Sequence, residues 1–193
     1  MNIATRIDDH AAYPEPPVRL GYITSQSRGA GDIILTEVAT RLLSAGHKVY
    51  GAVQNNTERT DGDRCDMDIV VLPGGQQLRV SQALGPGAKG CRLDNGALAQ
   101  AVADVEKGFS PQADLLVVNK FGKQEAIGGG FRDLIANALS WGVPVLTSVN
   151  ALNLDAFKQF AAGIETQLQP DDAQIAEWVR GASKARDVQC AHS

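Results

Sequence analysis

The segment from Tyr22 to Leu35 has the layout of a phosphate-binding loop but lacks two residues that make such a loop work. In a P-loop, backbone N–H groups cradle phosphate, a lysine reaches the outer phosphates and a serine or threonine holds Mg²⁺. Here Asp32 stands at the lysine position and Ile33 at the serine or threonine position. The motif therefore lacks its central cation, and the carboxylate that stands in its place would repel a triphosphate.

The donors that remain in this loop still suit an anion. Backbone N–H groups and the N-terminus of the helix that follows favour negative charge, and Arg28 could restore part of the missing positive charge. We therefore predict anion contacts from Ser25, Gln26, Ser27, Arg28, Gly29, Ala30, Gly31 and Asp32. The alternative is an ordinary strand-to-helix turn in which Asp32 is the helix N-cap.

A second polar group follows the apolar run that ends at Val118. A nucleotide hydrolase would place an acid at this strand end, to hold the water shell of a metal or to activate the attacking water. This chain has Asn119 and Lys120 instead, followed by Lys123 and Glu125. We predict that Asn119, Lys120 and Lys123 bind an anion and that Glu125 is the candidate catalytic base or the ion-pair partner of Lys123. The alternative is a solvated charged loop.

A third candidate is the loop that precedes Leu93. Residues 76–92 contain no acid, and glycines leave backbone N–H groups accessible. Arginine binds phosphate or a tetrahedral oxyanion bidentately, so we predict that Lys89, Cys91 and Arg92 contact an anion. The alternatives are a flexible connection with ordinary surface cations, and a buried cysteine in place of a reactive thiol.

These loops need a scaffold that brings them to one edge. Short apolar runs alternate with helical periodicity, which predicts a single α/β domain whose mainly parallel sheet is covered by helices and carries an inserted β-hairpin. Ligands bind such sheets beyond the carboxyl ends of the strands. Strands are expected at 18–24, 48–54, 114–119 and 143–149, the hairpin at 68–73 and 77–81, and helices at 32–45, 94–108 (with Asp94 as N-cap), 131–141, 154–162 and from 170 through 178.

Composition narrows the classes of function. The 193 residues suit one domain at 18–186, with a flexible arm at 1–17 and a tail at 187–193. A net charge of -4 argues against a general nucleic-acid binder. No apolar stretch is long enough to span a membrane and residues 1–17 do not resemble a signal peptide, so we expect a cytoplasmic protein without membrane contact. Three scattered cysteines and three histidines indicate neither a disulfide framework nor a metal site.

The motifs resemble two families. Gly122-Lys123-Gln124-Glu125 resembles the thermophile-type nucleoside triphosphatase family, whose P-loop enzymes carry an acidic pair before Gly-Lys-x-Glu, where this chain has Asn119 and Lys120. More closely, the runs at 65–68, 84–94 and 118–125 resemble the bacterial domain-of-unknown-function family 2478, which is grouped with P-loop nucleotide hydrolases and often encoded near molybdate-uptake genes. The resemblance covers about residues 18–163 and implies a three-layer P-loop-type fold.

Three functions follow as hypotheses. The first is a protein that binds a nucleotide or a tetrahedral oxyanion, phosphate or molybdate, in a regulatory or accessory role such as molybdenum homeostasis. The second is a divergent nucleoside triphosphatase that uses Mg²⁺, with Arg28 or Lys123 replacing the missing lysine and Glu125 positioning water. The third is a scaffold without a small ligand. The sequence leaves the cofactor and the choice between monomer and homo-oligomer open.

Overall fold

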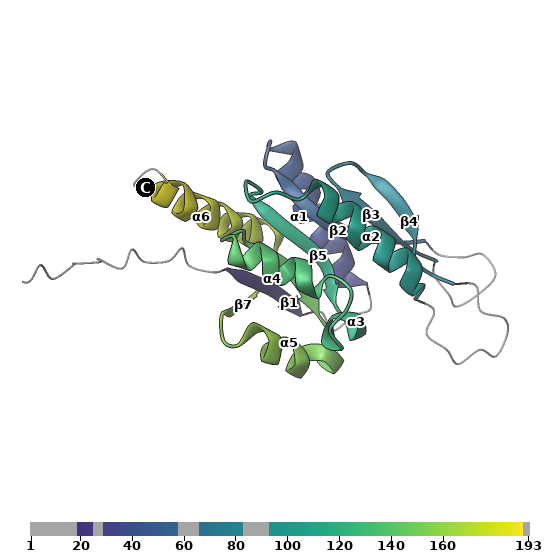
Figure 1. Ribbon diagram of the computed structural model, residues 1–193. Helices are drawn as coiled ribbons and strands as arrows, with labels where there is room; N and C mark the ends of the chain where they lie inside the picture. Colours follow the sequence, from purple (N-terminus) through teal and green to yellow (C-terminus); the bar gives the residue numbers. More distant parts are fainter. Residues whose placement is uncertain (1–18, 25–28, 58–65, 83–92, 191–193) are drawn as a thin grey trace, which may run out of the picture.

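A seven-stranded sheet forms the centre of the molecule (Figure 1). A computed structural model describes residues 19–24, 29–57, 66–82 and 93–190, of which 183–190 are described by their backbone alone. In this part of the chain the elements are β1 (Leu20–Thr24), α1 (Ala30–Ser44), β2 (Val49–Thr57), β3 (Asp66–Leu72), β4 (Gln76–Arg79), α2 (Asn95–Gly108), β5 (Leu115–Phe121), α3 (Lys123–Ala126), α4 (Arg132–Ser140), β6 (Val145–Val149), the 3₁₀ helix η1 (Ala151–Asn153), α5 (Leu154–Ala161), β7 (Glu165–Leu168) and α6 (Asp172–Cys190).

The strand order is β4-β3-β2-β5-β6-β1-β7. The strands from β2 to β7 in this order pair in parallel, whereas β3 pairs antiparallel with β2 and β4 pairs antiparallel with β3. The mainly parallel sheet with an inserted hairpin that the sequence predicts is therefore confirmed. β5 lies in the middle of the sheet and its first five residues are buried, which explains its continuous apolar run.

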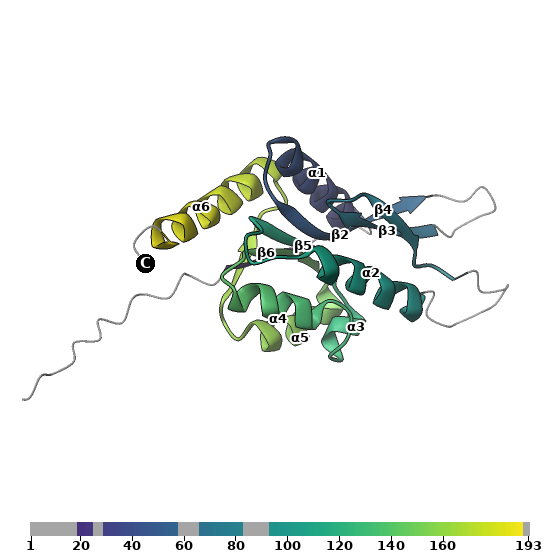
Figure 2. The ribbon, with the colours of Figure 1, turned by 45° about the horizontal axis from the view of Figure 1, so that its top comes forward.

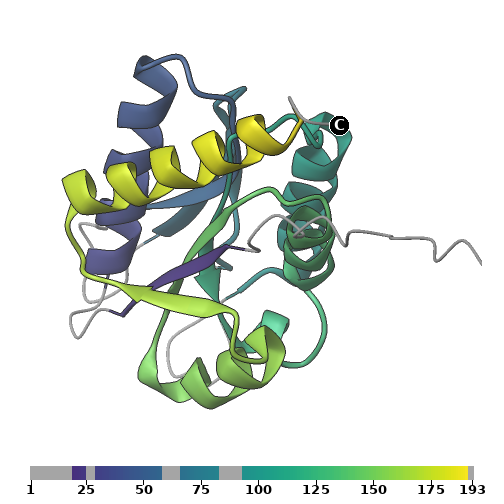
Figure 3. The ribbon, with the colours of Figure 1, turned by 90° about the vertical axis from the view of Figure 1, so that its left-hand side faces the viewer.

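Helices cover both faces of the sheet and give the domain three layers (Figure 2). One face carries α1 and α6, and Figure 3 shows α6, in yellow, crossing beside α1. The other face carries α2, α4 and α5. Each face has its own apolar core: Leu35 and Ile175 are fully buried on the α1 face, and Phe157 is fully buried on the other. The ring of Phe157 packs against Tyr22 at 4.9 Å and Phe121 at 5.2 Å between centroids.

The acids of the hairpin are structural. In the sequence, Asp66 and Asp68 belong to an alternating acidic run that is typical of a solvated loop. The structure instead pairs both with Arg79 of β4, and Asp68 is buried. The hydrogen bond to Asp68 is the main cause that raises the pKa of the Arg79 guanidinium. Cross-strand pairs of opposite charge stabilise neighbouring strands, so these acids hold β3 to β4.

Several boundaries differ from the sequence-based expectation. β5 continues to Phe121 and α3 occupies part of the stretch predicted as a loop. α6 runs to Cys190, well past Trp178. The sequence gives little sign of β7, because an edge strand with one polar face lacks the apolar run of a buried strand. No helix in the described ranges is long and apolar enough to cross a membrane.

Asp94 caps α2, as predicted. Its carboxylate Oδ1 accepts hydrogen bonds from the backbone N–H groups of Gly96 at 2.9 Å and Ala97 at 3.0 Å. Asp94→Ala is expected to lower the free energy of unfolding by about 1 kcal/mol, because two N–H groups of the first turn lose their acceptor. Urea unfolding followed by circular dichroism measures the loss. The exposed substitution Asp133→Ala is the control, since the side chain of Asp133 forms no cap in the structure.

Candidate functional site

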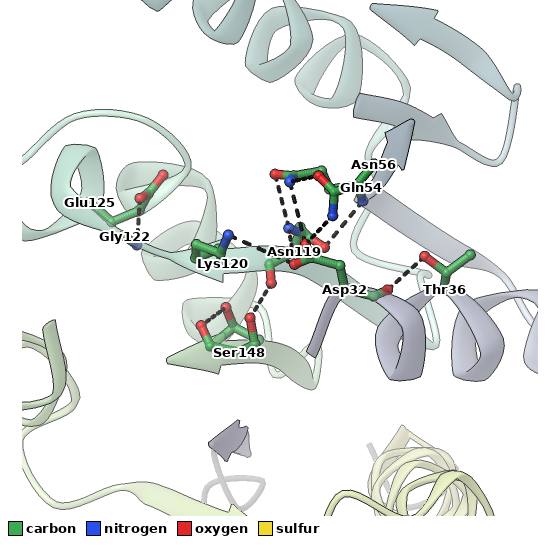
Figure 4. Close-up of polar contacts among 10 residues, drawn as sticks. Asp32, Thr36, Gln54, Asn56, Asn119, Lys120, Gly122, Glu125 and Ser148 are labelled. Carbon is green, nitrogen blue, oxygen red and sulfur yellow. Dashed lines mark hydrogen bonds and ion pairs between the residues drawn. The ribbon is translucent and has the colours of Figure 1, made fainter. Parts of the chain in front are cut away.

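Asp32 lies at the carboxyl edge of the sheet, where α1 meets the ends of β2 and β5 (Figure 4). The helix begins at Ala30 with Gly29 as its N-cap, so the alternative in which Asp32 is the N-cap is wrong. Gly29 adopts a left-handed conformation with φ 81°, which glycine reaches without strain and which starts the helix before Asp32. Asp32 therefore sits in the first helical turn, and it is 4% exposed.

Three amide side chains surround the Asp32 carboxylate. Asn56 Nδ2 donates to Oδ2 at 2.7 Å, Asn119 Nδ2 donates to Oδ1 at 3.0 Å, and Gln54 Nε2 donates to Oδ2 at 3.4 Å. Gln54 also donates to Asn56 Oδ1 at 2.7 Å, so the amides are bound to one another as well. A buried carboxylate requires such donors, because burial without partners would cost several kcal/mol.

Lys120 supplies the positive charge beside this carboxylate. Its Nζ lies 3.8 Å from Asp32 Oδ1, and its side chain is 42% exposed, whereas that of Asp32 is 6% exposed. Thus α1 carries the carboxylate and the end of β5 carries the lysine. A nucleotide hydrolase has the opposite arrangement, with a lysine at the start of this helix and an acid at this strand end. Asp32 and Lys120 compensate each other across the edge of the sheet.

Asn119 holds the two strand ends together. Its Oδ1 accepts from the backbone N–H of Gln54 at 3.1 Å, while its own backbone carbonyl accepts from the hydroxyl of Ser148. Its amide N–H also donates to Asp32, so the oxygen and the nitrogen of this buried side chain both form hydrogen bonds within the protein. The structure therefore gives Asn119 a positioning role in the part of the site that it describes.

Glu125 is buried rather than solvated. Its Oε2 accepts from the backbone N–H of Gly122 at 2.8 Å and its Oε1 accepts from that of Phe131 at 3.1 Å, and the residue is 4% exposed. Gly130 lies so close that a Cβ there would approach Glu125 Oε1 to 2.1 Å. The alternative of a solvated charged loop is wrong for this residue, and the structure pairs its carboxylate with backbone N–H groups rather than with Lys123.

A cavity of about 400 Å³ opens beside these residues, between α2, the hairpin and α3. One part of its wall is apolar and the rest, formed by the ends of β2 and β5 with α3, is polar. The apolar lining consists of Ala52, Met67, Ile69, Val80, Leu93, Leu98 and Phe131, and the remaining lining consists of Gln54, Asn119, Lys120, Gly122, Lys123, Gln124 and Glu125. The cavity thus combines a hydrophobic surface with two lysines, which suits a ligand that has an apolar part and an anionic part.

The structure brings together some of the residues that the sequence singles out. Asp32 contacts Asn119 and Lys120, and Lys120, Lys123 and Glu125 line the same cavity. Gly29, Ala30 and Gly31 form the start of α1. The predicted anion contacts Ser25, Gln26, Ser27, Arg28, Lys89, Cys91 and Arg92 lie outside the described residues.

Gln54 and Asn56 are the site residues that sequence reasoning missed. The predicted second strand ends at Gln54, whereas β2 continues to Thr57. A signal was present, because the polar run Gln54-Asn55-Asn56 directly follows an apolar strand, as the other candidates do. Among the described residues, no group of three or more His, Cys, Asp or Glu side chains could hold a metal ion.

Comparison with solved structures supports the fold. The crystal structure of THEP1 from the hyperthermophile Aquifex aeolicus matches with a TM-score of 0.57 over 78% of this chain and 88% of that one. The two sequences are 13% identical, so the likeness concerns the fold alone. The P-loop-type architecture implied by the sequence motifs is confirmed.

Comparison with sequences gives a relative and a family. A protein of Bradyrhizobium diazoefficiens named molybdenum import ATP-binding protein ModC 2 is 36% identical over 167 residues. The match covers 86% of this chain but 19% of that protein, so the chain spans about a fifth of the length of this relative. A family model described as protein of unknown function (DUF2478) matches residues 20–178. The chain belongs to this family, DUF2478.

Proposed function

We propose that this domain binds a nucleotide in the cavity at the carboxyl edge of the sheet and does so in a regulatory or accessory role linked to molybdate uptake. The observation that carries the proposal is the cavity, whose apolar wall faces a polar side with Lys120 and Lys123. Its volume of about 400 Å³ lies in the range of small-molecule sites. A purine or pyrimidine ring would cover the apolar wall, and a phosphate would meet the lysines.

A bare tetrahedral oxyanion fits this cavity less well. Phosphate or molybdate would use the lysines but would leave Leu98, Phe131 and the other apolar side chains in contact with water. Burying apolar surface is favourable by roughly 25 cal/mol per Å², so a ligand with a ring gains more from this cavity. Both ligand classes remain in the test below, because both present oxygen atoms to the same cations.

Binding without hydrolysis agrees with the carboxylates of the site. Asp32 accepts hydrogen bonds from three side-chain amides, and Glu125 accepts from two backbone N–H groups. A general base needs access to the water that it activates, and the Glu125 carboxylate is already occupied by backbone N–H groups. Asp32, which would repel a triphosphate, replaces the lysine of the loop. These contacts support a ligand-binding role for the domain over a divergent triphosphatase.

The link with molybdate uptake comes from the relative. That protein is named a molybdenum import ATP-binding protein, and about four-fifths of its length lies outside the match. A domain related to this chain is therefore part of a longer import protein in Bradyrhizobium diazoefficiens. This arrangement supports an accessory role in which ligand binding in the cavity regulates an uptake system.

The test is a calorimetric titration of the full chain and its Lys123→Ala variant. The ligands are AMP, GMP, ATP, phosphate and molybdate, each with and without Mg²⁺. Lys123 is exposed and lines the cavity. Losing a hydrogen bond to a charged group costs about 1.5–3 kcal/mol, so nucleotide affinity should fall roughly ten- to hundredfold. Lys107→Ala, in the last turn of α2, is the matched control and should leave binding unchanged.

The outcomes separate the functions. Nucleotide binding that weakens in Lys123→Ala alone supports the proposal. Binding of molybdate or phosphate without nucleotides would replace it with oxyanion handling. Mg²⁺-dependent phosphate release would replace it with a triphosphatase, and no binding of any ligand would leave the scaffold role.

A further inference from the structure

We infer that Asp32 sets the charge of the ligand, so that the cavity takes a nucleoside monophosphate and discriminates against a triphosphate. The inference rests on the proposed function and names the ligand class within it. Its basis is a fixed carboxylate beside Lys120, the cation on which an anionic group would dock. The contacts of Asp32 with Lys120, Asn56 and Asn119 give it a role opposite to that of an anion-binding residue.

The charges of the described residues around the cavity are balanced. The described ionisable side chains are Lys120 and Lys123, which line it, with Glu125 in its wall and Asp32 beside Lys120. Two cations therefore face two carboxylates, and this part of the site carries no net charge. A phosphate monoester brings about 1.5 to 2 negative charges at pH 7, and each further phosphate group adds to them. Among the described residues, this balance of charges favours the ligand with fewer negative charges.

The position of Asp32 makes the repulsion direct. A phosphate oxygen hydrogen-bonded to Lys120 Nζ would lie at most about 7 Å from Asp32 Oδ1, because Asp32 Oδ1 is itself 3.8 Å from the same nitrogen. Near a protein surface, like charges at such a separation change a binding constant by roughly tenfold or more for each unit of charge. The penalty thus grows with the number of phosphate groups near Lys120.

Asp32 cannot easily move away from an incoming phosphate. It sits in the first turn of α1, it is almost fully buried, and the amides of Asn56, Asn119 and Gln54 hold both of its oxygens. Leaving these donors unpaired would cost free energy for each buried group. The carboxylate therefore acts as a fixed competitor for Lys120 rather than as a side chain that adapts to the ligand.

The experiment compares AMP, ADP and ATP by calorimetry without Mg²⁺, using the full chain, Asp32→Asn and Asp172→Asn. The wild-type protein should bind AMP most tightly and ATP most weakly. In Asp32→Asn, the ratio of ATP affinity to AMP affinity should rise roughly tenfold or more, because one negative charge is removed beside Lys120. Asp172→Asn removes the same charge from an exposed ion pair with Arg41 and should keep the wild-type order.

The wild-type order alone tests the inference should Asp32→Asn fail to fold. Tighter binding of ATP than AMP by the wild-type chain, or an unchanged ratio in a folded Asp32→Asn variant, overturns it while leaving the nucleotide proposal intact. If neither the wild-type chain nor Asp172→Asn binds any of the three nucleotides, and the wild-type chain does not bind GMP either, the proposed function itself fails and the inference with it. A structural role for Asp32 would lower stability without changing the ratio.

Discussion

Gly51→Ala is expected to destabilise the fold by about 2 to 6 kcal/mol, the sum of backbone strain and overpacking. Gly51 lies inside β2 with φ +124°, where side chains are rarely tolerated, and a Cβ there would come within 1.9 Å of the carbonyl oxygen of Val117. That carbonyl belongs to β5, the central strand, so it cannot give way as a flexible side chain would. Urea unfolding followed by circular dichroism measures the change.

Gly74→Ala is the matched control for this prediction. Gly74 lies in the turn between β3 and β4, and an added Cβ there would meet no atom within 4 Å. Its substitution should change the free energy of unfolding by less than about 0.5 kcal/mol. Equal stability of the two variants would show that β2 and β5 do not approach as closely as the structure has them.

Glu125→Ala is expected to lower the free energy of unfolding by about 2 to 6 kcal/mol and to weaken nucleotide binding at least as much as Lys123→Ala does. The substitution leaves the N–H groups of Gly122 and Phe131 without their acceptor, at about 1–3 kcal/mol each. Gly122 and Lys123 line the cavity, so loosening this turn displaces a cation of the proposed site. Unfolding and calorimetric titration with AMP measure the two effects.

The controls distinguish this role from catalysis. Glu106→Ala removes an exposed glutamate from α2 and should change neither property. Glu125→Gln keeps a carbonyl oxygen for one of the two N–H groups and should lie between the wild-type chain and Glu125→Ala. A Glu125→Gln variant with unchanged stability and lost turnover of a nucleotide would contradict the positioning role and favour a catalytic base.

Most of the fold could be predicted from the sequence, because the patterns that indicate its strands and helices lie within short segments of the chain. Continuous apolar residues around Val117 predict a central strand, and Asp94 before a periodic segment predicts a cap. β7 could not be predicted, because polar residues at an edge strand do not alternate clearly with buried ones. The predicted start of α1 was wrong for a different reason: Gly29 is the N-cap, although Asp32 is of a residue type that caps helices more often.

The site could be predicted only in part from the sequence, because its main contacts join residues that are far apart along the chain. Asp32 and Asn119 are separated by 87 positions, and neither residue type reveals that one donates to the other. The sequence predicts Asp32 and Lys120 as separate anion contacts on two loops and does not show that their charges compensate each other. Glu125 was recognised as a candidate, whereas its role as an acceptor for Gly122 depends on a turn that looked like a loop.

The most direct test of the central claim is a crystal structure of the full chain grown with AMP. We predict that the base lies against Leu98 and Phe131 and that the phosphate lies beside Lys120 and Lys123. An AMP molecule bound elsewhere on the protein, with the cavity empty, would contradict the account.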